Sequence, residues 1–389
     1  MRFHIASEEM IKQGQTTDIY FARTEEILRK RGFDRVRVVA DVITTSFPRN
    51  WNWGLFCGIE ELTHLLENKP VTVYSMDEGS LFFSYEPVLW IEGNYVDFAV
   101  LETAILGLIA QASGIATAAA HCKLAAGDHN IISFGIRRMH PAISPMVDRA
   151  AYIGGCDGFS GVAAAKLLKI EAVGTMPHAL IIAFGNQVVA WKAFDEIMDK
   201  DIPRLALVDT YADEKAEAIM AAEALGKKLQ GVRLDTPSSR RGDMARIVKE
   251  VRWELDLRGF KHVKIFVSGG LDEHQIKELI AAGADAFGVG TYISGAPPID
   301  FALDIVEADG KPAAKRVKLS VKKQVYRCPN CLSDTVVKFV EKPSKCKKCK
   351  AKLKPMLHPL IENGKLVRKL PNVREIRKKV LAQLGKIGN

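Results

Sequence analysis

Short apolar segments alternate with helical stretches over the middle of this chain. The stretches Asp213–Leu229 and Asp272–Ala282 carry apolar residues at helical spacing, and each opens with acidic residues that favour the first turn of a helix. Six apolar segments are expected to form strands: Ile131–Phe134, Ala172–Gly174, Leu205–Asp209, Val232–Asp235, Lys264–Ser268 and Ala286–Val289. Strands that alternate with helices pair in parallel, so the sequence predicts an α/β fold.

Polar or glycine residues follow nearly every expected strand. They are Arg137, Thr175, Asp209, Asp235, the pair Gly269–Gly270 and the pair Gly290–Thr291. Six strand–helix units fit either an open sheet or an incomplete barrel, but barrel enzymes gather their sites from the carboxyl ends of the strands in this way. We therefore predict an incomplete or irregular TIM-like βα barrel.

The length of 389 residues indicates more than one domain. We expect an N-terminal α/β domain over residues 1–125 and the βα barrel over residues 126–295. Residues 296–327 and 353–389 are expected to complete the N-terminal domain, and residues 328–352 to form a small cysteine module. Two strands are expected in the N-terminal domain: Val36–Val42 and Val71–Ser75.

One stretch of the N-terminal domain has the length of a membrane span. Phe98–Ala120 is apolar, but Glu102, Gln111 and several alanines and glycines dilute it. We predict that Asp97–Ala120 is a helix buried in a soluble core. The seven cysteines form no disulfide framework, and the N-terminus carries no secretion signal. These features favour a cytoplasmic protein without a membrane partner.

The net charge of +9 and the sequence pI of about 9.1 suit an anionic partner, whether nucleic acid, a membrane surface or a phosphorylated substrate. The basic residues crowd into Lys311–Arg327 and Lys342–Lys354, outside the expected barrel. The net charge therefore does not indicate what the expected barrel binds, and nucleic acid is not an expected partner.

Two glycine-rich segments end neighbouring strands. They are Val267–Gly270, which contains Ser268 and Gly269, and Phe287–Thr291, which contains Gly288 and Gly290. Glycine lets backbone N–H groups approach a phosphate, and consecutive late strands of barrels often form such a site. We expect these segments to bind phosphate; the alternative is a pair of tight turns without a ligand.

Arg233, Asp235 and Asp209 end two further strands. Carboxylates at strand ends can hold ribose hydroxyls or a Mg²⁺-bound pyrophosphate, and an arginine can neutralise phosphate charge. An ion pair that only caps two strands is the alternative.

Phe134 is followed closely by Arg137 and Arg138. A phenyl ring can stack on a flat substrate ring while a guanidinium binds a carboxylate through two parallel bonds. Arginine pairs also occur on solvated faces, so this signal is only moderately specific.

Two close cysteine pairs lie near the C-terminus. Cys328 and Cys331 are separated from Cys346 and Cys349 by residues 332–345, a spacing typical of tetrahedral Zn²⁺ sites. Because four protein ligands leave no open position, we predict a structural zinc ion.

Taken in order, these motifs resemble the nicotinate phosphoribosyltransferase family, and more distantly the nicotinamide and quinolinate enzymes of the same fold. The resemblance spans residues 14–291. The matching segments are Thr17–Tyr20, Phe134–Arg138, Asp157, Gly174–His178 with Thr175, Asp209, Arg233–Asp235, Ser268–Gly270 and Gly288–Thr291. The resemblance implies that Asp157 and Thr175 bind substrate. It also implies a homodimer or higher oligomer with shared active sites, and nicotinate and phosphoribosyl pyrophosphate as substrates.

The resemblance also implies residue roles on the base side of the site. Tyr20 would enter the site of the neighbouring subunit and stack on the pyridine opposite Phe134. Arg137 would support the phosphoribosyl group or the base. Arg138 stands where nicotinamide enzymes have glycine, which favours a base that carries a carboxylate.

On the phosphate side, the resemblance implies that Asp209 and Asp235 face the ribose and the Mg²⁺-pyrophosphate, and that the glycine turns hold the 5′-phosphate. His178 matches a phosphohistidine that couples ATP hydrolysis to synthesis. Two departures stand out. Residues 236–239 replace the Ser-Gly-Asp that often follows the matching aspartate, and the four-cysteine module lies outside the usual pattern.

We therefore expect nicotinate and phosphoribosyl pyrophosphate to give nicotinate mononucleotide and pyrophosphate. A quinolinate phosphoribosyltransferase is the nearest alternative. An alternative of another class is a zinc-ribbon nucleic-acid-binding protein with an inactive barrel, which strong, salt-dependent RNA binding would favour.

Overall fold

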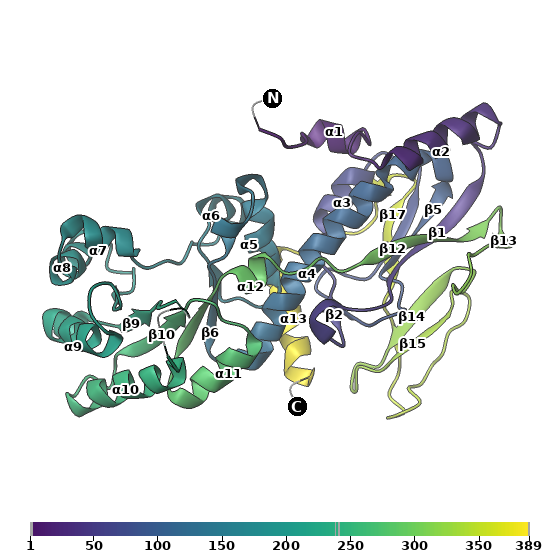
Figure 1. Cartoon of the computed structure of the whole chain (residues 1–389). Helices are drawn as coiled ribbons and strands as arrows, with labels where there is room; N and C mark the ends of the chain where they lie inside the picture. Colours follow the sequence, from purple (N-terminus) through teal and green to yellow (C-terminus); the bar gives the residue numbers. More distant parts are fainter. Residues whose placement is uncertain (1–2, 238, 240–241, 388–389) are drawn as a thin grey trace. The chain divides into compact units, whose positions relative to one another are not determined.

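The computed structural model describes residues 3–237, 239 and 242–387. The chain divides into two compact units (Figure 1). The first unit comprises residues 1–117 and 297–389, and the second comprises residues 118–296.

The second unit contains a six-stranded parallel sheet in the order β7-β6-β11-β10-β9-β8. The strands are β6 Asn130–Ser133, β7 Gly158–Phe159, β8 Leu205–Leu207, β9 Gly231–Leu234, β10 Lys264–Ser268 and β11 Ala286–Val289. The last strand, β11, pairs with the first, β6, as it does in a barrel. Among the described residues no hydrogen-bonded ladder joins β7 to β8, so the prediction of an incomplete barrel is confirmed.

Helices follow the strands of this sheet. They are α5 Ser144–Ile153, α6 Val162–Leu168, α7 His178–Phe184, α8 Gln187–Ile197, α9 Glu214–Leu225, α10 Met244–Leu257, α11 Glu273–Ala282 and α12 Thr291–Ser294. Asp213, Asp243 and Asp272 precede α9, α10 and α11, and each carboxylate accepts backbone N–H groups of the first turn. This capping role explains the acidic residues that the sequence shows at the starts of α9 and α11.

The predicted strand Ala172–Gly174 is wrong. The segment is extended, and the Val173 N–H donates to the Phe159 carbonyl at 2.8 Å, but it joins no ladder. Val173 is 36% exposed, so little apolar burial favours a regular strand there. The strand that pairs with β6 at the edge of the sheet is instead the two-residue β7, which the sequence did not predict. The predicted helix Asp213–Leu229 also ends early, at Leu225, because Gly226 turns the chain with a φ of +55°.

The first unit is built on a seven-stranded sheet in the order β13-β12-β1-β5-β3-β17-β18. The strands are β1 Arg37–Thr44, β3 Thr72–Ser75, β5 Leu89–Asn94, β12 Phe301–Ala308, β13 Lys311–Pro312, β17 His358–Glu362 and β18 Lys365–Leu366. Every pairing in it is antiparallel. The two strands predicted in this region correspond to β1 and β3.

Four main helices belong wholly or partly to the first unit: α2 Ile19–Lys30, α3 Ile59–Leu66, α4 Glu102–Ala126 and α13 Val373–Ile387. By length and composition alone, the helical stretch Ala99–Ala126 could cross a membrane. Ile105 and Ile109 are nevertheless fully buried in the core of this unit. The predicted buried helix is present, shifted from Asp97–Ala120 to the bounds of α4.

A three-stranded antiparallel sheet, in the order β15-β14-β16, carries the cysteine-rich segment. Its strands are β14 Lys323–Arg327, β15 Asp334–Lys338 and β16 Lys354–Pro355. Tyr326, Cys328, Cys346 and Leu353 form a small apolar cluster of their own. A core this small needs a cross-link or a metal to be stable, which agrees with the concentration of cysteines there.

Candidate active site

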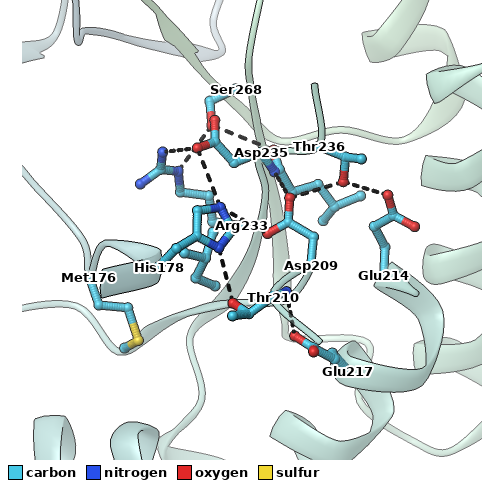
Figure 2. Close-up of polar contacts among 12 residues, drawn as sticks. Met176, His178, Asp209, Thr210, Glu214, Glu217, Arg233, Asp235, Thr236 and Ser268 are labelled. Atoms are coloured by element: carbon cyan, nitrogen blue, oxygen red, sulfur yellow. Dashed lines mark hydrogen bonds and ion pairs between the residues drawn. The ribbon is translucent and has the colours of Figure 1, made fainter. Parts of the chain in front are cut away.

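Polar side chains meet beyond the carboxyl ends of β8, β9 and β10 (Figure 2). Asp209 follows β8, and its carboxylate is 3% exposed. Its Oδ2 accepts the Asp235 N–H at 2.9 Å and the Thr236 hydroxyl at 2.9 Å. Its Oδ1 is buried without a hydrogen-bond partner and lies 3.6 Å from Nε2 of His178. The site therefore contains a carboxylate oxygen that accepts no hydrogen bond among the described residues and that faces the His178 ring.

Arg233 links the ends of three segments. Its guanidinium donates to the Thr175 hydroxyl at 2.8 Å and to the Ser268 hydroxyl at 3.0 Å, and pairs with Oδ2 of Asp235 at 2.9 Å. The Ser268 hydroxyl in turn donates to Oδ1 of Asp235 at 2.6 Å. Parallel strands end at the same edge, so residues at the carboxyl ends of β9 and β10 meet here despite their distance in sequence.

The charge of Asp209 is strongly influenced by its surroundings. Burial raises the pKa of its carboxyl, and the neighbouring Asp235 raises it further. The Thr236 hydroxyl, His178 and the Asp235 N–H offset only part of this effect. A cation or a proton at Oδ1 would therefore stabilise this buried carboxyl group.

Phe134 forms the apolar side of the same region. The Arg233 guanidinium carbon lies 5.4 Å from the centre of its ring, within range of a cation–π contact. Gly288 on β11 lies against the ring, because an added Cβ there would be only 2.6 Å from Phe134. The predicted glycine at this position thus makes room for an aromatic ring of the site.

The second glycine turn follows β10. Gly269 and Gly270 have φ values of +95° and +70°, which disfavour other residues. Gly269 packs against the backbone of Asp235, since an added Cβ would lie 3.3 Å from that carbonyl. Gly290 directly precedes α12, which begins at Thr291. The structure thus places the turn after β10 beside the carboxylates, and phosphate binding by both glycine turns stays a prediction.

Not every predicted site residue joins this cluster. Arg137 and Arg138 lie after β6 in the 3₁₀ turn Ile136–Arg138, and both side chains are exposed. Tyr20 belongs to the other unit, where it is 57% exposed on α2.

Asp157 lies at the amino ends of β6 and β7, the wrong end of the sheet for this site. Its carboxylate accepts the Ile131 N–H at 2.9 Å and pairs with Lys123 at 3.0 Å. It is therefore engaged in holding the start of β6, and its predicted contact with substrate is not supported by its position.

Sequence reasoning missed several residues of the cluster. Thr210, Glu214, Glu217 and Thr236 all contact the loops that carry the predicted residues. In the sequence, the two glutamates resemble ordinary acidic residues in the first turn of a helix, and the two threonines resemble ordinary loop residues. The only signal was their closeness in sequence to Asp209 and Asp235. Of the unusual loop 236–239, Ser238 lies outside the described residues.

The four cysteines form a separate candidate metal site. Their Sγ atoms all lie within 4.8 Å of one another, and Cys328 and Cys349 approach to 3.3 Å. The Ser333 hydroxyl lies 3.1 Å from Cys331 Sγ and 3.3 Å from Cys346 Sγ. Four thiol groups in this arrangement fit a tetrahedral zinc ion.

Comparison with known families gives the class of the protein. Residues 18–113 and 115–304 match the N-terminal and C-terminal domains of quinolinate phosphoribosyl transferase. Residues 333–389 match the nicotinate phosphoribosyltransferase C-terminal domain. The expectation that the whole cysteine module lies outside the family pattern is therefore wrong for the part that begins at residue 333. The fold and the site define a phosphoribosyltransferase.

Individual relatives narrow this class. The chain is 32% identical over 364 residues to the nicotinate phosphoribosyltransferase of Bacillus subtilis, covering 81% of this chain and 73% of the relative. It is 34% identical to one from Mycobacterium tuberculosis, over 66% of this chain and 56% of that protein. The chain belongs to the nicotinate phosphoribosyltransferase family.

Two solved structures are similar over nearly the whole chain. A nicotinate-nucleotide pyrophosphorylase from Pyrococcus furiosus shares 59% identity with a TM-score of 0.98, covering 100% of this chain and 99% of that one. Human nicotinic acid phosphoribosyltransferase shares 20% identity with a TM-score of 0.77, covering 95% and 94%, and supports the fold alone.

Proposed function

We propose that this protein transfers the phosphoribosyl group from phosphoribosyl pyrophosphate to nicotinate, giving nicotinate mononucleotide and pyrophosphate. The observation that carries the proposal is the network in which Arg233 joins Asp235 and Ser268 beside the buried Asp209. In a member of this family, that network is where a phosphorylated sugar and its leaving group would bind.

The chemistry requires charge stabilisation more than proton transfer. The bond from ribose C1 to pyrophosphate breaks as the pyridine nitrogen forms a new bond to C1. The nitrogen lone pair of nicotinate is already free, so no general base is needed. Positive charge develops on the ribose and negative charge on the pyrophosphate, which suits a site of carboxylates with an arginine.

Mg²⁺ fits this site. Oδ1 of Asp209, which accepts no hydrogen bond among the described residues, and the carboxylate of Asp235, which faces the same ring nitrogen of His178, are oxygen ligands of the type that Mg²⁺ takes. When bound, the ion would neutralise charge on the departing pyrophosphate. We also propose that His178 takes the γ-phosphoryl group of ATP, forming a nitrogen–phosphorus bond as the bond to the departing ADP breaks. Its Nε2 lies 3.6 Å from Asp209 and 3.9 Å from Asp235, so one cluster of residues would serve both reactions.

Choice of base rests on Arg137 and Arg138 in the proposal. Both are exposed and close in sequence to Phe134, which supports a role for one of them in binding the carboxylate of a base stacked on the ring. The family matches over residues 18–304 leave quinolinate as the second candidate base. The relatives named above and the C-terminal match favour nicotinate.

We further propose a homodimer with shared active sites, a structural zinc ion and a cytoplasmic location. Tyr20 supports the first, because an exposed aromatic residue on α2 is available to a second subunit. The close approach of the four cysteine sulfurs supports the second. The buried core helix α4 and the lack of a disulfide framework in the sequence agree with the third.

One assay tests the central proposal. Purified protein with phosphoribosyl pyrophosphate and Mg²⁺ is given nicotinate, nicotinamide or quinolinate in parallel, and the mononucleotides are quantified. Nicotinate should be used most efficiently. Preferential use of quinolinate with release of CO₂ would establish the second candidate, and turnover of none of the three would reject the function.

A further inference from the structure

Glu217 is a buried charged residue to which neither the sequence nor the proposed reaction assigns a role. It lies in the first turn of α9 and has no exposed surface. Its two carboxylate oxygens accept three backbone N–H groups, from Thr210 at 3.1 Å, Tyr211 at 2.7 Å and Ala212 at 2.8 Å. A buried carboxylate is tolerated because such bonds compensate its charge.

All three N–H groups belong to one loop, residues 210–212, which directly follows Asp209. This loop has little apolar packing of its own, since Tyr211 is 54% exposed. The hydrogen bonds to Glu217 are therefore the main restraint on its backbone among the contacts of the described residues.

The loop in turn contacts His178 (Figure 2). The Thr210 hydroxyl lies 3.0 Å from Nδ1 of His178. Nε2, on the other side of the ring, faces Asp209 at 3.6 Å and Asp235 at 3.9 Å. The hydroxyl contact thus determines which ring nitrogen faces the carboxylates.

We propose that Glu217 is a positioning residue for His178. By fixing loop 210–212, it holds the Thr210 hydroxyl on Nδ1 and keeps Nε2 directed at Asp209 and Asp235. The effect on turnover rests on the proposed function, in which His178 takes part. The ring orientation itself is a property of the free protein and can be measured without any substrate.

Four single variants separate this role from a purely structural one. Glu217→Gln keeps the size of the side chain but presents an NH₂ group to N–H donors. Thr210→Val keeps the shape and removes the hydroxyl, whereas Thr210→Ser keeps the hydroxyl. Glu223→Gln is the matched control, because Glu223 is an exposed residue of the same helix.

The readouts are the ¹⁵N chemical shifts of the His178 ring, and kcat and KM with nicotinate. Glu217→Gln and Thr210→Val should both move the ring shifts and lower kcat about ten- to a hundredfold, with KM changed less than about threefold. Thr210→Ser, which keeps the hydroxyl, should restore most of what Thr210→Val loses, whereas Glu223→Gln should leave both readouts close to native. The double variant Glu217→Gln with Thr210→Val should be no worse than Thr210→Val alone, because both act through one contact.

Native ring shifts and native kcat in folded Glu217→Gln would overturn the proposal, as would additive losses in the double variant. If Glu217→Gln does not fold, Glu217→Asp takes its place, since it keeps the charge and loses reach to the loop. If the native protein turns over no pyridine base, the proposed function fails, and the ring shifts of His178 alone still decide whether Glu217 positions it.

Discussion

Asp209 shows how the properties of one residue follow from its neighbours. Its Oδ2 is satisfied by the Asp235 N–H and the Thr236 hydroxyl, whereas its Oδ1 is buried, accepts no hydrogen bond among the described residues and lies 3.6 Å from Nε2 of His178. A buried acceptor without a hydrogen bond costs about 1–3 kcal/mol, so the fold maintains this arrangement at the expense of stability. Such a group is typical of a site that is completed by a ligand or a cation.

Arg138 is the residue whose replacement tests base recognition. Arg138→Gly should raise KM for nicotinate about ten- to a hundredfold, the equivalent of roughly 1.5–3 kcal/mol for one charge-assisted contact. KM for phosphoribosyl pyrophosphate should change much less, and steady-state kinetics measure both. Lys169→Gly is a suitable control, since Lys169 is exposed and its φ of +54° suits glycine. Equal efficiency of the native enzyme with nicotinamide would contradict the assignment.

The proposed phosphorylation of His178 can be tested with labelled ATP. Incubation with γ-labelled ATP and Mg²⁺ should leave an acid-labile, base-stable label on the native chain, because a neutral imidazole is nucleophilic near neutral pH. His178→Asn should take up none, and His262→Asn, at an exposed histidine of the same unit, should label normally. An unlabelled native chain that makes product equally well without ATP would make His178 a binding residue only.

At the scale of elements, the sequence predicts where strands end better than how loops are held. Asp209, Arg233, Asp235 and Ser268 were identified because polar residues follow apolar runs, and the parallel sheet brings them together. Glu217 was missed because its function depends on three backbone N–H groups of a preceding loop, which no side-chain pattern encodes.

At residues 172–174 the sequence predicted a strand that the structure does not contain. The apolar residues of this segment suggested the strand, but an exposed stretch with a single backbone bond to its neighbour gains too little from pairing. Asp157 lies away from the cluster for a related reason: whether a residue precedes or follows a two-residue strand decides which end of the sheet it occupies.

A titrating group, Glu86, contacts the small sheet that carries the cysteines through Arg327 of β14. Burial raises the pKa of Glu86 to about 9, and the neighbouring Asp334 adds to the effect despite Arg327, which pairs with both carboxylates. Between the ordinary glutamate pKa of 4.5 and about 9, Glu86 is therefore protonated in the folded chain and ionised in the unfolded chain. Over this window, the contribution of Glu86 to stability falls as pH rises.

Glu86→Gln should remove this dependence. The free energy of unfolding of the variant, measured by denaturant titration, should decline less than that of the native chain between pH 5 and pH 9. Glu341→Gln, at an exposed residue after β15, serves as the control. Parallel declines in the native chain and the Glu86 variant would show that this carboxyl is already ionised in the folded state.

The cysteine cluster should carry one zinc ion for each chain. Chelation, or Cys328→Ser, should lower the melting temperature, because the small cluster around Tyr326 and Leu353 has few other contacts to hold it. The kcat of the protein that stays folded should change little. Elemental analysis gives the zinc content, and Cys122→Ser, at a buried cysteine outside the cluster, is a control. A protein without zinc, or one that loses turnover but not stability, would exclude a structural ion.

At the scale of the whole molecule, the proposed dimer assigns roles to residues of both units. Asp209, Arg233, Asp235 and His178 all belong to residues 118–296, whereas Tyr20 belongs to the other unit. The proposed stacking of Tyr20 on the base in a neighbouring subunit means that each site needs residues from two chains. This arrangement makes activity depend on assembly, which is open to a direct test.

The test mixes two inactive proteins. Tyr20→Ala and Asp235→Ala homodimers should each be nearly inactive, since every site in them lacks one essential side chain. After unfolding together and refolding, about half of the dimers should be hybrids with one intact site in two, so about a quarter of native activity should return. Each variant refolded alone is the control, and both must elute at the native size. Because complementation requires exchange of chains, activity that does not return in verified hybrids, or a fully active native monomer, would rule out the shared site.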